Sequence, residues 1–439
     1  MAGRSDEWAS QGIATARPRD VMSGRTPQQL ARRLTVFDAV VIGLGAMIGA
    51  GVFAAPGPAA AAAGTWMLAG LVLAAVVAYA NAASSAQLAA LYPESGGTYV
   101  YAREQLGDYW GFLAGWSFVV GKTASLSAMA LTFGTYVYPD LARPLGIAAV
   151  VALTVVNYRG VEKTARLTRL IVAVVLAALA AVVAASLFGG QSTAANLDTV
   201  APNGVWGVLQ SGGLLFFAFA GYARLATLGE EVRNPESTIP RAIPIALWLV
   251  VGIYAVVLTT ALLAVGSETL AEAPAPLAAA VEAGRWAAAA PLVRFGAAVA
   301  SAGVLLSLLA GLSRTTLSMA RRRELPRVLD AVHADHRTPH RAELAAAILV
   351  SAIVVVADLR GAIGFSSFAV LTYYGLANAS AFTLTAAQRR WPKWLAALGV
   401  ALCSLLALTL PLMAVIGGLI LLTTGSLAWL ITRRINRRP

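Results

Sequence analysis

The chain has 439 residues, of which 58% are hydrophobic and only 12% are charged, and its mean hydropathy is +0.72. Soluble globular proteins do not have this composition, so we predict an all-α polytopic membrane protein. The net charge of +12 does not indicate a nucleic-acid partner, because Lys and Arg lie in alternate loops between apolar runs. The single cysteine, Cys403, lies in an apolar run, so no disulfide framework is expected.

The first 33 residues are polar and rich in Gly, Ser, Arg and Gln. They lack an early apolar segment, so we expect no cleaved signal peptide. We expect this segment to be a disordered cytosolic tail.

The first apolar run, residues 36–62, is interrupted at its centre by Gly43, Gly45, Gly49 and Gly51. Each glycine lowers helix stability by about 1 kcal/mol relative to alanine. An interrupted helix at membrane depth must be buried in protein or line a cavity, where its free amides and carbonyls can hold a polar solute. The alternative is close helix packing, with Gly45 and Gly49 as a small-xxx-small pair.

Further apolar runs follow along the chain, and together they predict twelve membrane spans. The approximate ranges are 36–62, 65–90, 110–137, 144–157, 167–189, 206–228, 242–266, 291–319, 342–358, 361–386, 393–410 and 411–432. If the N-terminus is cytosolic, 26 of the 33 Lys and Arg residues fall in cytosolic segments. This agrees with the positive-inside rule and predicts that both termini are cytosolic.

The sixth span contains a second candidate break at residues 212–222, where glycines alternate with aromatic residues. The two candidate breaks lie five spans apart, so the two broken spans have opposite orientations, as in a five-plus-five inverted repeat. Gly221 beside aromatic residues is equally compatible with simple helix packing.

Two loops have distinctive sequences. Residues 92–104 predict a short amphipathic helix at the membrane surface. Residues 229–243 predict a structured cytosolic loop, in which Asn234-Pro235 ends one helix and Pro240 suits the start of the next.

These segments together resemble a known family. The first-span glycine motif, Pro-Glu-Ser-Gly-Gly-Thr-Tyr at residues 93–99, the loop at residues 229–243 and residues 313–326 resemble bacterial amino-acid permeases. These permeases belong to the amino acid–polyamine–organocation superfamily, and the resemblance runs from about residue 33 to 390. It implies the leucine-transporter-type five-plus-five inverted repeat with two additional C-terminal helices. The expected division is a tail (1–33), a first repeat (34–190), a second repeat (191–388) and the last two spans with a basic C-terminus (389–439).

The resemblance also implies a substrate site at the two breaks. The substrate carboxylate would meet the backbone of Ile48, Gly49, Ala50 and Gly51, where a half-helix presents its positive N-terminal end. The amine would meet carbonyl groups, which belong to Gly45, Ala46, Phe217, Ala218 and Ala220. Phe219 and Tyr222 would form the pocket wall or a gate, unless they serve only helix or lipid packing.

Two positions depart from the family pattern. Some members carry a lysine midway along the fifth span, proposed to act in proton coupling, but Val175 stands there in this chain. Many members have an acidic residue after the sixth-span glycine and aromatic residue, but here Ala223 and Arg224 follow. Arg224 is either a surface arginine or part of a gate pair, and its candidate partners are Glu94, Glu230 and Glu231.

Lys122 lies about 18 Å along the third span, near the middle of the bilayer. A lysine at this depth costs at least ~2.5 kcal/mol on insertion scales and usually has a function. We predict a residue that couples transport to protons or organises the pocket. The alternative is a structural lysine that snorkels or binds helix-end carbonyls.

Other ionisable and hydroxyl groups are weaker indications of a binding site. His333, His336 and His340 share one loop with Asp335, which favours an ordinary solvated loop over a metal site. The eighth span carries hydroxyl groups that could bind sodium but are common in packed membrane helices: Ser301, Ser307, Ser313, Thr315 and Thr316. The chain has no catalytic motif, so neither an enzyme, a cofactor nor a metal is expected.

We therefore predict an amino-acid permease of the cytoplasmic membrane that works by alternating access and proton symport. Exchange is the alternative coupling mode, and cationic amino acids, amines or polyamines are the alternative substrates. The alternative of a different class is a non-transporting sensor or partner subunit on the same fold. The expected partners are an amino acid or amine, protons and the lipid bilayer, with no nucleic acid.

Overall fold

The structure is a computed structural model, which describes residues 35–92, 96–160, 165–197, 201–222 and 232–436. The described residues form helices and connecting turns, without a strand. The helices of the first half are α1 (Val36–Met47), α2 (Ala50–Ala54), α3 (Pro56–Ala63), α4 (Met67–Leu91), α5 (Thr98–Leu106), α6 (Asp108–Val137), α7 (Ala142–Tyr158) and α8 (Ala165–Phe188). Those of the second half are α9 (Gly204–Phe219), α11 (Pro235–Glu272), α12 (Pro276–Glu282), α13 (Ala290–Arg321), α14 (His340–Val356), α15 (Leu359–Phe382), α16 (Lys393–Thr409) and α17 (Leu412–Asn436).

Many of these helices are long and apolar enough to cross a membrane. Seven candidate spans occur among the described residues: Val36–Ala54, Pro56–Leu91, Pro139–Tyr158, Arg166–Phe188, Ser237–Glu272, Ala287–Arg321 and Leu412–Arg434. Two shorter apolar helices, Gly204–Phe219 and Lys393–Thr409, accompany them. The prediction of an all-α polytopic membrane protein is therefore confirmed.

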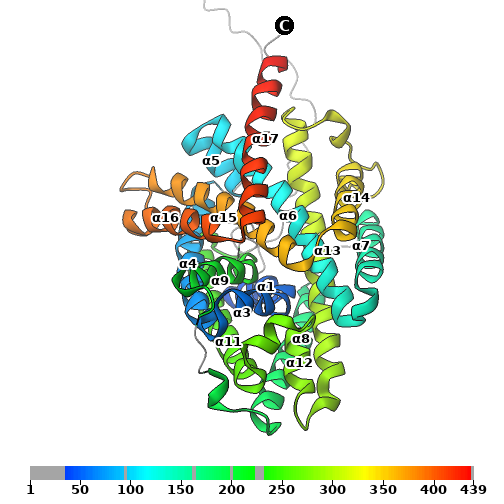
Figure 1. Cartoon of the computed structure of the whole chain (residues 1–439). Helices are drawn as coiled ribbons and strands as arrows, with labels where there is room; N and C mark the ends of the chain where they lie inside the picture. Colours follow the sequence, from blue (N-terminus) through cyan, green and yellow to red (C-terminus); the bar gives the residue numbers. More distant parts are fainter. Residues whose placement is uncertain (1–34, 93–95, 161–164, 198–200, 223–231, 437–439) are drawn as a thin grey trace, which may run out of the picture.

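The short helices α1 and α3 lie with α9 near the centre of the molecule (Figure 1). Helices α7, α13 and α14 are on one side of this centre, and α4, α15 and α16 are on the other (Figure 1). Helix α6 packs along both α13 and α15, and α4 packs along α9. The two segments predicted to be interrupted are thus enclosed by longer helices.

The start of α1 is fixed by a capping box. The Thr35 hydroxyl accepts from the Asp38 N–H at 3.2 Å, and the Asp38 carboxylate accepts from the Thr35 N–H at 3.1 Å. Asp38 also forms an ion pair with Arg169 of α8 at 2.5 Å. These contacts hold the first half-helix against α8.

Helix α11 differs from the sequence-based expectation, because it begins at Pro235, seven residues before the predicted start of the seventh span at 242. The inference that the next helix begins near Pro240 was wrong. Asn234 adopts a left-handed conformation (φ 46°) and Pro235 takes the first helical position, where its missing N–H has no intrahelical partner to lose. Pro240 and Pro244 then lie inside the helix.

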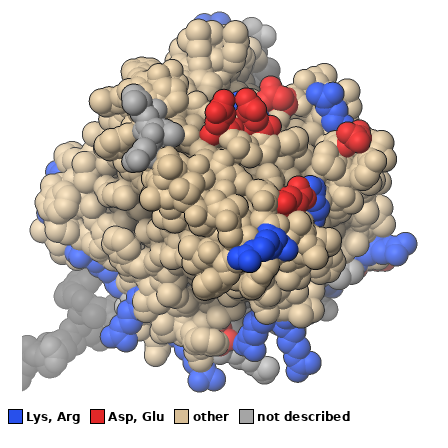
Figure 2. Space-filling view, turned by 60° about the horizontal axis from the view of Figure 1, so that its bottom comes forward, with Lys and Arg blue, Asp and Glu red and all other residues tan. Residues whose placement is uncertain are grey.

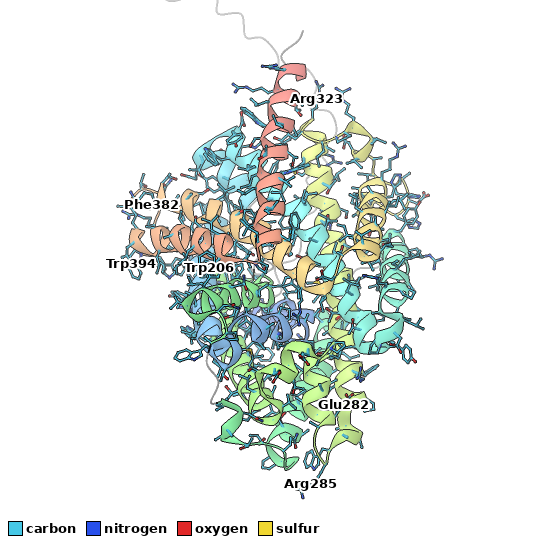
Figure 3. The ribbon with its side chains drawn as sticks, viewed as in Figure 1. Trp206, Glu282, Arg285, Arg323, Phe382 and Trp394 are labelled. Carbon is cyan, nitrogen blue, oxygen red and sulfur yellow. The ribbon has the colours of Figure 1, made fainter. Side chains whose placement is uncertain are left out.

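The surface is largely uncharged on the face shown in Figure 2, with Lys and Arg concentrated toward its margin. Figure 3 places Arg323 at one end of the molecule and Glu282 and Arg285 at the opposite end. The predicted map puts residues 285 and 323 in loops on opposite sides of the membrane, so the arrangement agrees with that map.

Candidate functional site

The first predicted span is interrupted between α1 and α2. Ile48 (φ −77°, ψ 65°) and Gly49 (φ −111°, ψ −151°) leave the helical conformation. The Ile48 N–H donates to the Leu44 carbonyl at 2.7 Å, and the Gly49 N–H donates to the Met47 carbonyl at 2.8 Å. The helix resumes at Ala50, and helical dihedral angles at Ala55 join α2 to α3. Two half-helices therefore meet at Ile48 and Gly49.

The sixth predicted span ends its regular helix at Phe219. Ala220 and Tyr222 then form long turn-type bonds of 3.4 Å, to the carbonyls of Phe217 and Phe219. The remainder of that span, including Ala223 and Arg224, lies outside the described residues, as do Glu94, Glu230 and Glu231. The Arg224 gate pair therefore stays a prediction.

The two interruptions are in direct contact. A Cβ atom added to Gly51 would lie 2.5 Å from the Ala218 Cα, and one added to Gly221 would lie 2.0 Å from the Ala46 carbonyl oxygen. No side chain fits at these crossing points, so both positions require glycine. The sequence-distant segments 46–51 and 218–221 form one unit.

Gly45 and Gly49 do not serve a single helix interface. A Cβ atom on Gly45 would lie 2.7 Å from Val172 Cγ2 of α8, whereas one on Gly49 would lie 2.4 Å from Val304 Cγ2 of α13. Because the break separates them, the two glycines face different helices. The glycines of the first span therefore allow both the break in the helix and its close packing against α8 and α13.

Tyr254 of α11 connects both interruptions. Its hydroxyl group donates to the Met47 carbonyl oxygen at 2.7 Å and lies 3.1 Å from the Ala218 carbonyl oxygen. Tyr374 of α15 donates to the Ala220 carbonyl at 3.3 Å. A carbonyl oxygen has two lone pairs, so the Met47 carbonyl, which also accepts from the Gly49 N–H, is fully used, whereas the carbonyls of Ala218 and Ala220 can each accept one further bond, for example from an ammonium group.

The predicted site residues lie together in the protein interior. Gly45, Ile48, Gly49, Ala50, Gly51, Phe217, Ala218, Phe219 and Tyr222 are buried, and Ala46 and Ala220 are half-buried. Phe219 packs against Tyr254 with ring centroids 5.2 Å apart, and Tyr222 packs against Tyr374 at 4.9 Å. Both aromatic side chains therefore contact protein rather than lipid.

Lys122 is buried halfway along the 30-residue helix α6, with 8% of its surface exposed. Each end of α6 is about 20 Å away at 1.5 Å per residue, which is beyond the reach of a snorkelling lysine. One turn before it, Phe118 packs against Tyr373 of α15 at 5.2 Å, and one turn after it, Ser125 Oγ lies 2.5 Å from Ser366 Oγ. The Lys122 ammonium group makes no hydrogen bond or ion pair with any residue that the structure describes.

The short helix predicted within residues 92–104 is present as α5, its place at the membrane surface stays a prediction, and it contacts the residues that follow α13. The Tyr99 hydroxyl donates to Glu324 Oε2 at 2.6 Å, and Arg103 forms an ion pair with the same carboxylate. Burial and the neighbouring Glu324 raise the pKa of Tyr99. Burial alone would lower the pKa of Arg103, but the hydrogen bond and charge of Glu324 outweigh it and raise that pKa. Both groups thus stay protonated at physiological pH.

Sequence reasoning missed Tyr254, Tyr374 and Glu324. The two tyrosines lie in apolar runs, where a buried hydroxyl needs a hydrogen-bond partner. Their position in the sequence therefore indicates that each hydroxyl binds a polar group of another segment. Nothing in the sequence indicated which carbonyl each would reach. Glu324 was inconspicuous among the basic residues of its loop.

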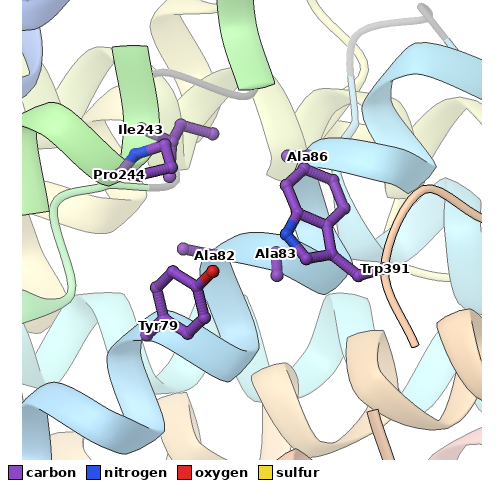
Figure 4. A pocket seen from close by; sticks show the side chains of 7 residues that line it. All are labelled: Tyr79, Ala82, Ala83, Ala86, Ile243, Pro244 and Trp391. Carbon is purple, nitrogen blue, oxygen red and sulfur yellow. The ribbon is translucent and has the colours of Figure 1, made fainter. Parts of the chain in front are cut away.

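Two other features stand apart from the breaks. His333, His336 and His340 surround Tyr158, with the first two rings 4.8 Å apart, but the described part of the chain contains no group of three residues arranged to hold a metal ion. Figure 4 shows a small apolar pocket beside α4 and α11. It is lined by Tyr79, Ala82, Ala83, Ala86, Ile243, Pro244 and Trp391, none of them a predicted site residue.

Comparison with known proteins identifies the family. The amino acid permease family matches residues 34–432. An uncharacterized transporter of Mycobacterium tuberculosis is 56% identical over 421 residues, which cover 96% of this chain and 94% of the relative. A branched-chain amino acid permease of Bacillus subtilis is 26% identical (71% and 72% covered), and a serine/threonine exchanger of the same organism is 28% identical (81% and 84% covered). The chain therefore belongs to the amino acid permease family, and it is a membrane transporter rather than an enzyme.

Proposed function

We propose that this protein is a secondary active transporter that moves amino acids across the cytoplasmic membrane by alternating access, coupled to protons. The observation that carries the proposal is the contact between the two interrupted helices, which gathers backbone amides and carbonyls inside an apolar protein. The names of the relatives, an amino acid permease and an amino acid exchanger among them, support the substrate class.

The proposed architecture has twelve spans, a five-plus-five inverted repeat and both termini in the cytosol. Helices coincide with the predicted apolar runs, and the two interruptions fall in the first and sixth of them. The distribution of Lys and Arg in alternate loops supports the orientation.

In the proposed site, the substrate carboxylate binds the amides of Ala50 and Gly51 at the start of the second half-helix, and the Gly49 amide joins them when it exchanges the Met47 carbonyl for the substrate. The amine binds the carbonyl oxygens of Ala46 and Ala218. The Tyr254 hydroxyl lies 3.1 Å from the Ala218 oxygen, whose second lone pair can accept from the amine. Lys122 organises the pocket or takes part in coupling. If Lys122→Met and Lys122→Gln both transported normally with unchanged pH dependence, Lys122 would have neither role.

The first test measures thermal stabilisation of the purified protein by each amino acid, by common amines and by polyamines, across pH. A ligand that binds the folded state raises the melting temperature by mass action. Gly49→Ala should abolish the stabilisation, because its Cβ atom meets Val304, whereas Gly311→Ala should not, because a Cβ atom there meets nothing within 4 Å. If no amino acid stabilises the protein at any pH, the proposal fails.

Uptake into proteoliposomes then decides the coupling. Proton symport requires that an inwardly directed proton gradient drive accumulation in vesicles without internal substrate. Exchange, the alternative that the exchanger among the relatives favours, requires internal amino acid and no gradient.

A further inference from the structure

We propose that Glu343 of α14 is the residue that binds the transported proton and releases it. This inference rests on the proposed function and names the group that performs its coupling. Proton symport requires a group inside the protein that takes up a proton on one side of the membrane and releases it on the other. A carboxylate can do this, because it becomes a neutral acid when it gains the proton and a charged group again when the proton leaves.

Glu343 is buried where three helices meet. It is 2% exposed, and among the side chains that the structure describes it is the single buried Asp or Glu. Its carboxylate interacts with the side-chain amide of Asn157, near the end of α7, and with the positive charge of Arg314 in α13. Helix α14 packs against both α7 and α13. A change in the charge of this carboxylate therefore alters contacts among three helices.

The partners of Glu343 suit both of its charge states. The Asn157 amide can donate to a carboxylate through Nδ2, and it can accept from a protonated carboxyl group through Oδ1. Arg314 only donates and is always positively charged, so it favours the ionised form. The site thus offers a partner to the charged and to the neutral carboxyl group, as a group that alternates between the two requires.

Asn157 also connects Glu343 to the helix that packs against the first interruption. Its Nδ2 donates to the Leu306 carbonyl oxygen of α13 at 3.0 Å. Leu306 lies two residues from Val304, about 3 Å along the helix axis, and a Cβ atom on Gly49 would lie 2.4 Å from Val304 Cγ2. Asn157 is therefore bound to α13 at the level of the break. In the proposal, protonation of Glu343 changes how Asn157 holds α13, so proton binding and substrate binding act on one helix.

The charge of Glu343 depends on few neighbours. The remaining ionisable groups at this end of the three helices are Tyr158, Arg159 and those of residues 321–341, which include His333, His336 and His340. Among the described residues, however, Arg314 is the one charged group that acts on the Glu343 carboxylate. Helix α6 meets α14 through the Ser127 hydroxyl, which donates to the Val350 carbonyl at 3.3 Å. Lys122 lies about 140° around α6 from Ser127, so it does not face α14.

The experiment measures two transport modes in proteoliposomes, with a radiolabelled mixture of the common amino acids as the probe. The first is accumulation driven by an inwardly directed proton gradient into vesicles without internal substrate. The second is exchange against internal unlabelled amino acids without a gradient. Glu343→Gln mimics the neutral, protonated form and cannot release a proton. We expect it to lose accumulation, down to the level of protein-free liposomes, and to keep exchange, because the substrate-loaded protein can still change its conformation. The exchange rate should depend on pH in the wild-type protein but not in Glu343→Gln.

Glu282→Gln is the matched control. Its carboxylate is 43% exposed and pairs with Arg294, at the end of the molecule opposite Arg323 (Figure 3). It should leave both transport modes unchanged. Glu343→Asp keeps a carboxylate, so it should retain accumulation with a shifted pH profile. If Glu343→Gln does not fold, this profile decides, since an unchanged pH profile in Glu343→Asp contradicts the proposal.

Accumulation by Glu343→Gln at the wild-type level overturns the inference, and a loss of accumulation in Lys122→Met would then assign the proton to Lys122. A folded Glu343→Gln protein that performs neither mode also overturns it, because that result gives Glu343 a structural role. If the wild-type protein exchanges but does not accumulate amino acids, proton coupling and this inference fail, while amino-acid transport stands. The proposed transport of amino acids itself fails only if no amino acid binds or is transported.

Discussion

The hydroxyl group of Tyr254 donates a hydrogen bond to the carbonyl oxygen of Met47 at 2.7 Å. Met47 is the last residue of the first half-helix, so its carbonyl has lost its regular helical partner. The same hydroxyl lies 3.1 Å from the Ala218 carbonyl in α9. One side chain of α11 therefore joins the two interrupted helices.

Tyr254→Phe should destabilise the protein and slow transport. The change removes the buried hydroxyl that donates to the Met47 carbonyl, and the loss of one such hydrogen bond costs about 1 kcal/mol. Melting temperature and initial uptake rate are the measurements. Tyr79→Phe is the control, since the Tyr79 ring packs against Trp248 and the structure gives its hydroxyl no hydrogen bond. Equal stability of the two variants would contradict the bridging role.

Gly51→Ala should abolish transport and lower the free energy of unfolding. The steric clash should cost more than the higher helix propensity of alanine contributes. The added Cβ atom would lie 2.5 Å from the Ala218 Cα and 2.9 Å from its Cβ, so two backbones must separate. Gly252→Ala is the matched control on α11, where a Cβ atom meets nothing within 4 Å. It should be neutral or stabilise by up to ~1 kcal/mol. Substrate transport by Gly51→Ala at the wild-type rate would rule out the close crossing.

Glu324→Gln should weaken the attachment of α5 to the end of α13. Glu324 and Arg103 are each only 13% exposed, so the variant leaves a charge poorly compensated and costs about 1–3 kcal/mol. Asp330→Asn is the control, because its ion pair with Arg321 is exposed (59% and 40%) and contributes at most about 1 kcal/mol. Chemical denaturation monitored by tryptophan fluorescence measures the free energy of unfolding of each variant, and Glu324→Gln should lose more than Asp330→Asn.

A double-mutant cycle of Arg103→Gln with Glu324→Gln isolates the pair. We expect a coupling energy clearly larger than that of the corresponding cycle for Arg321 and Asp330. If the two cycles agree, the α5 contact is an ordinary surface ion pair.

Cys403 should react with a thiol reagent only when the protein unfolds. It is the single cysteine of the chain, it is 1% exposed, and its thiol lies against Asn81 at 3.2 Å. A fluorogenic maleimide should therefore label one site per chain along the thermal unfolding curve and almost none before it. Ala334→Cys in a Cys403→Ser background, at an exposed loop position, should react at once without heating. Fast labelling of native Cys403 would show that α16 opens readily.

The amino-acid sequence determined the class of this protein and most of its helix map. Long apolar runs can satisfy their backbone groups in a membrane only as helices, so composition and run length were sufficient for that prediction. The glycine cluster at residues 43–51 also placed the first interruption, because glycines lower helix propensity wherever they gather. The start of α11 was misplaced, because prolines inside a helix and prolines at its start look alike in sequence.

Only the tertiary structure decided which groups meet at the interruptions. The approach of Gly51 to Ala218 and the bond from Tyr254 to Met47 join residues far apart in the chain, and side-chain direction there follows from helix packing rather than from local pattern. The same holds for Lys122. Its depth follows from counting residues, but its lack of a counter-charge follows from where every other described carboxylate lies. Local pattern fixes each helix, whereas the pairing of buried polar groups is a property of the assembled interior.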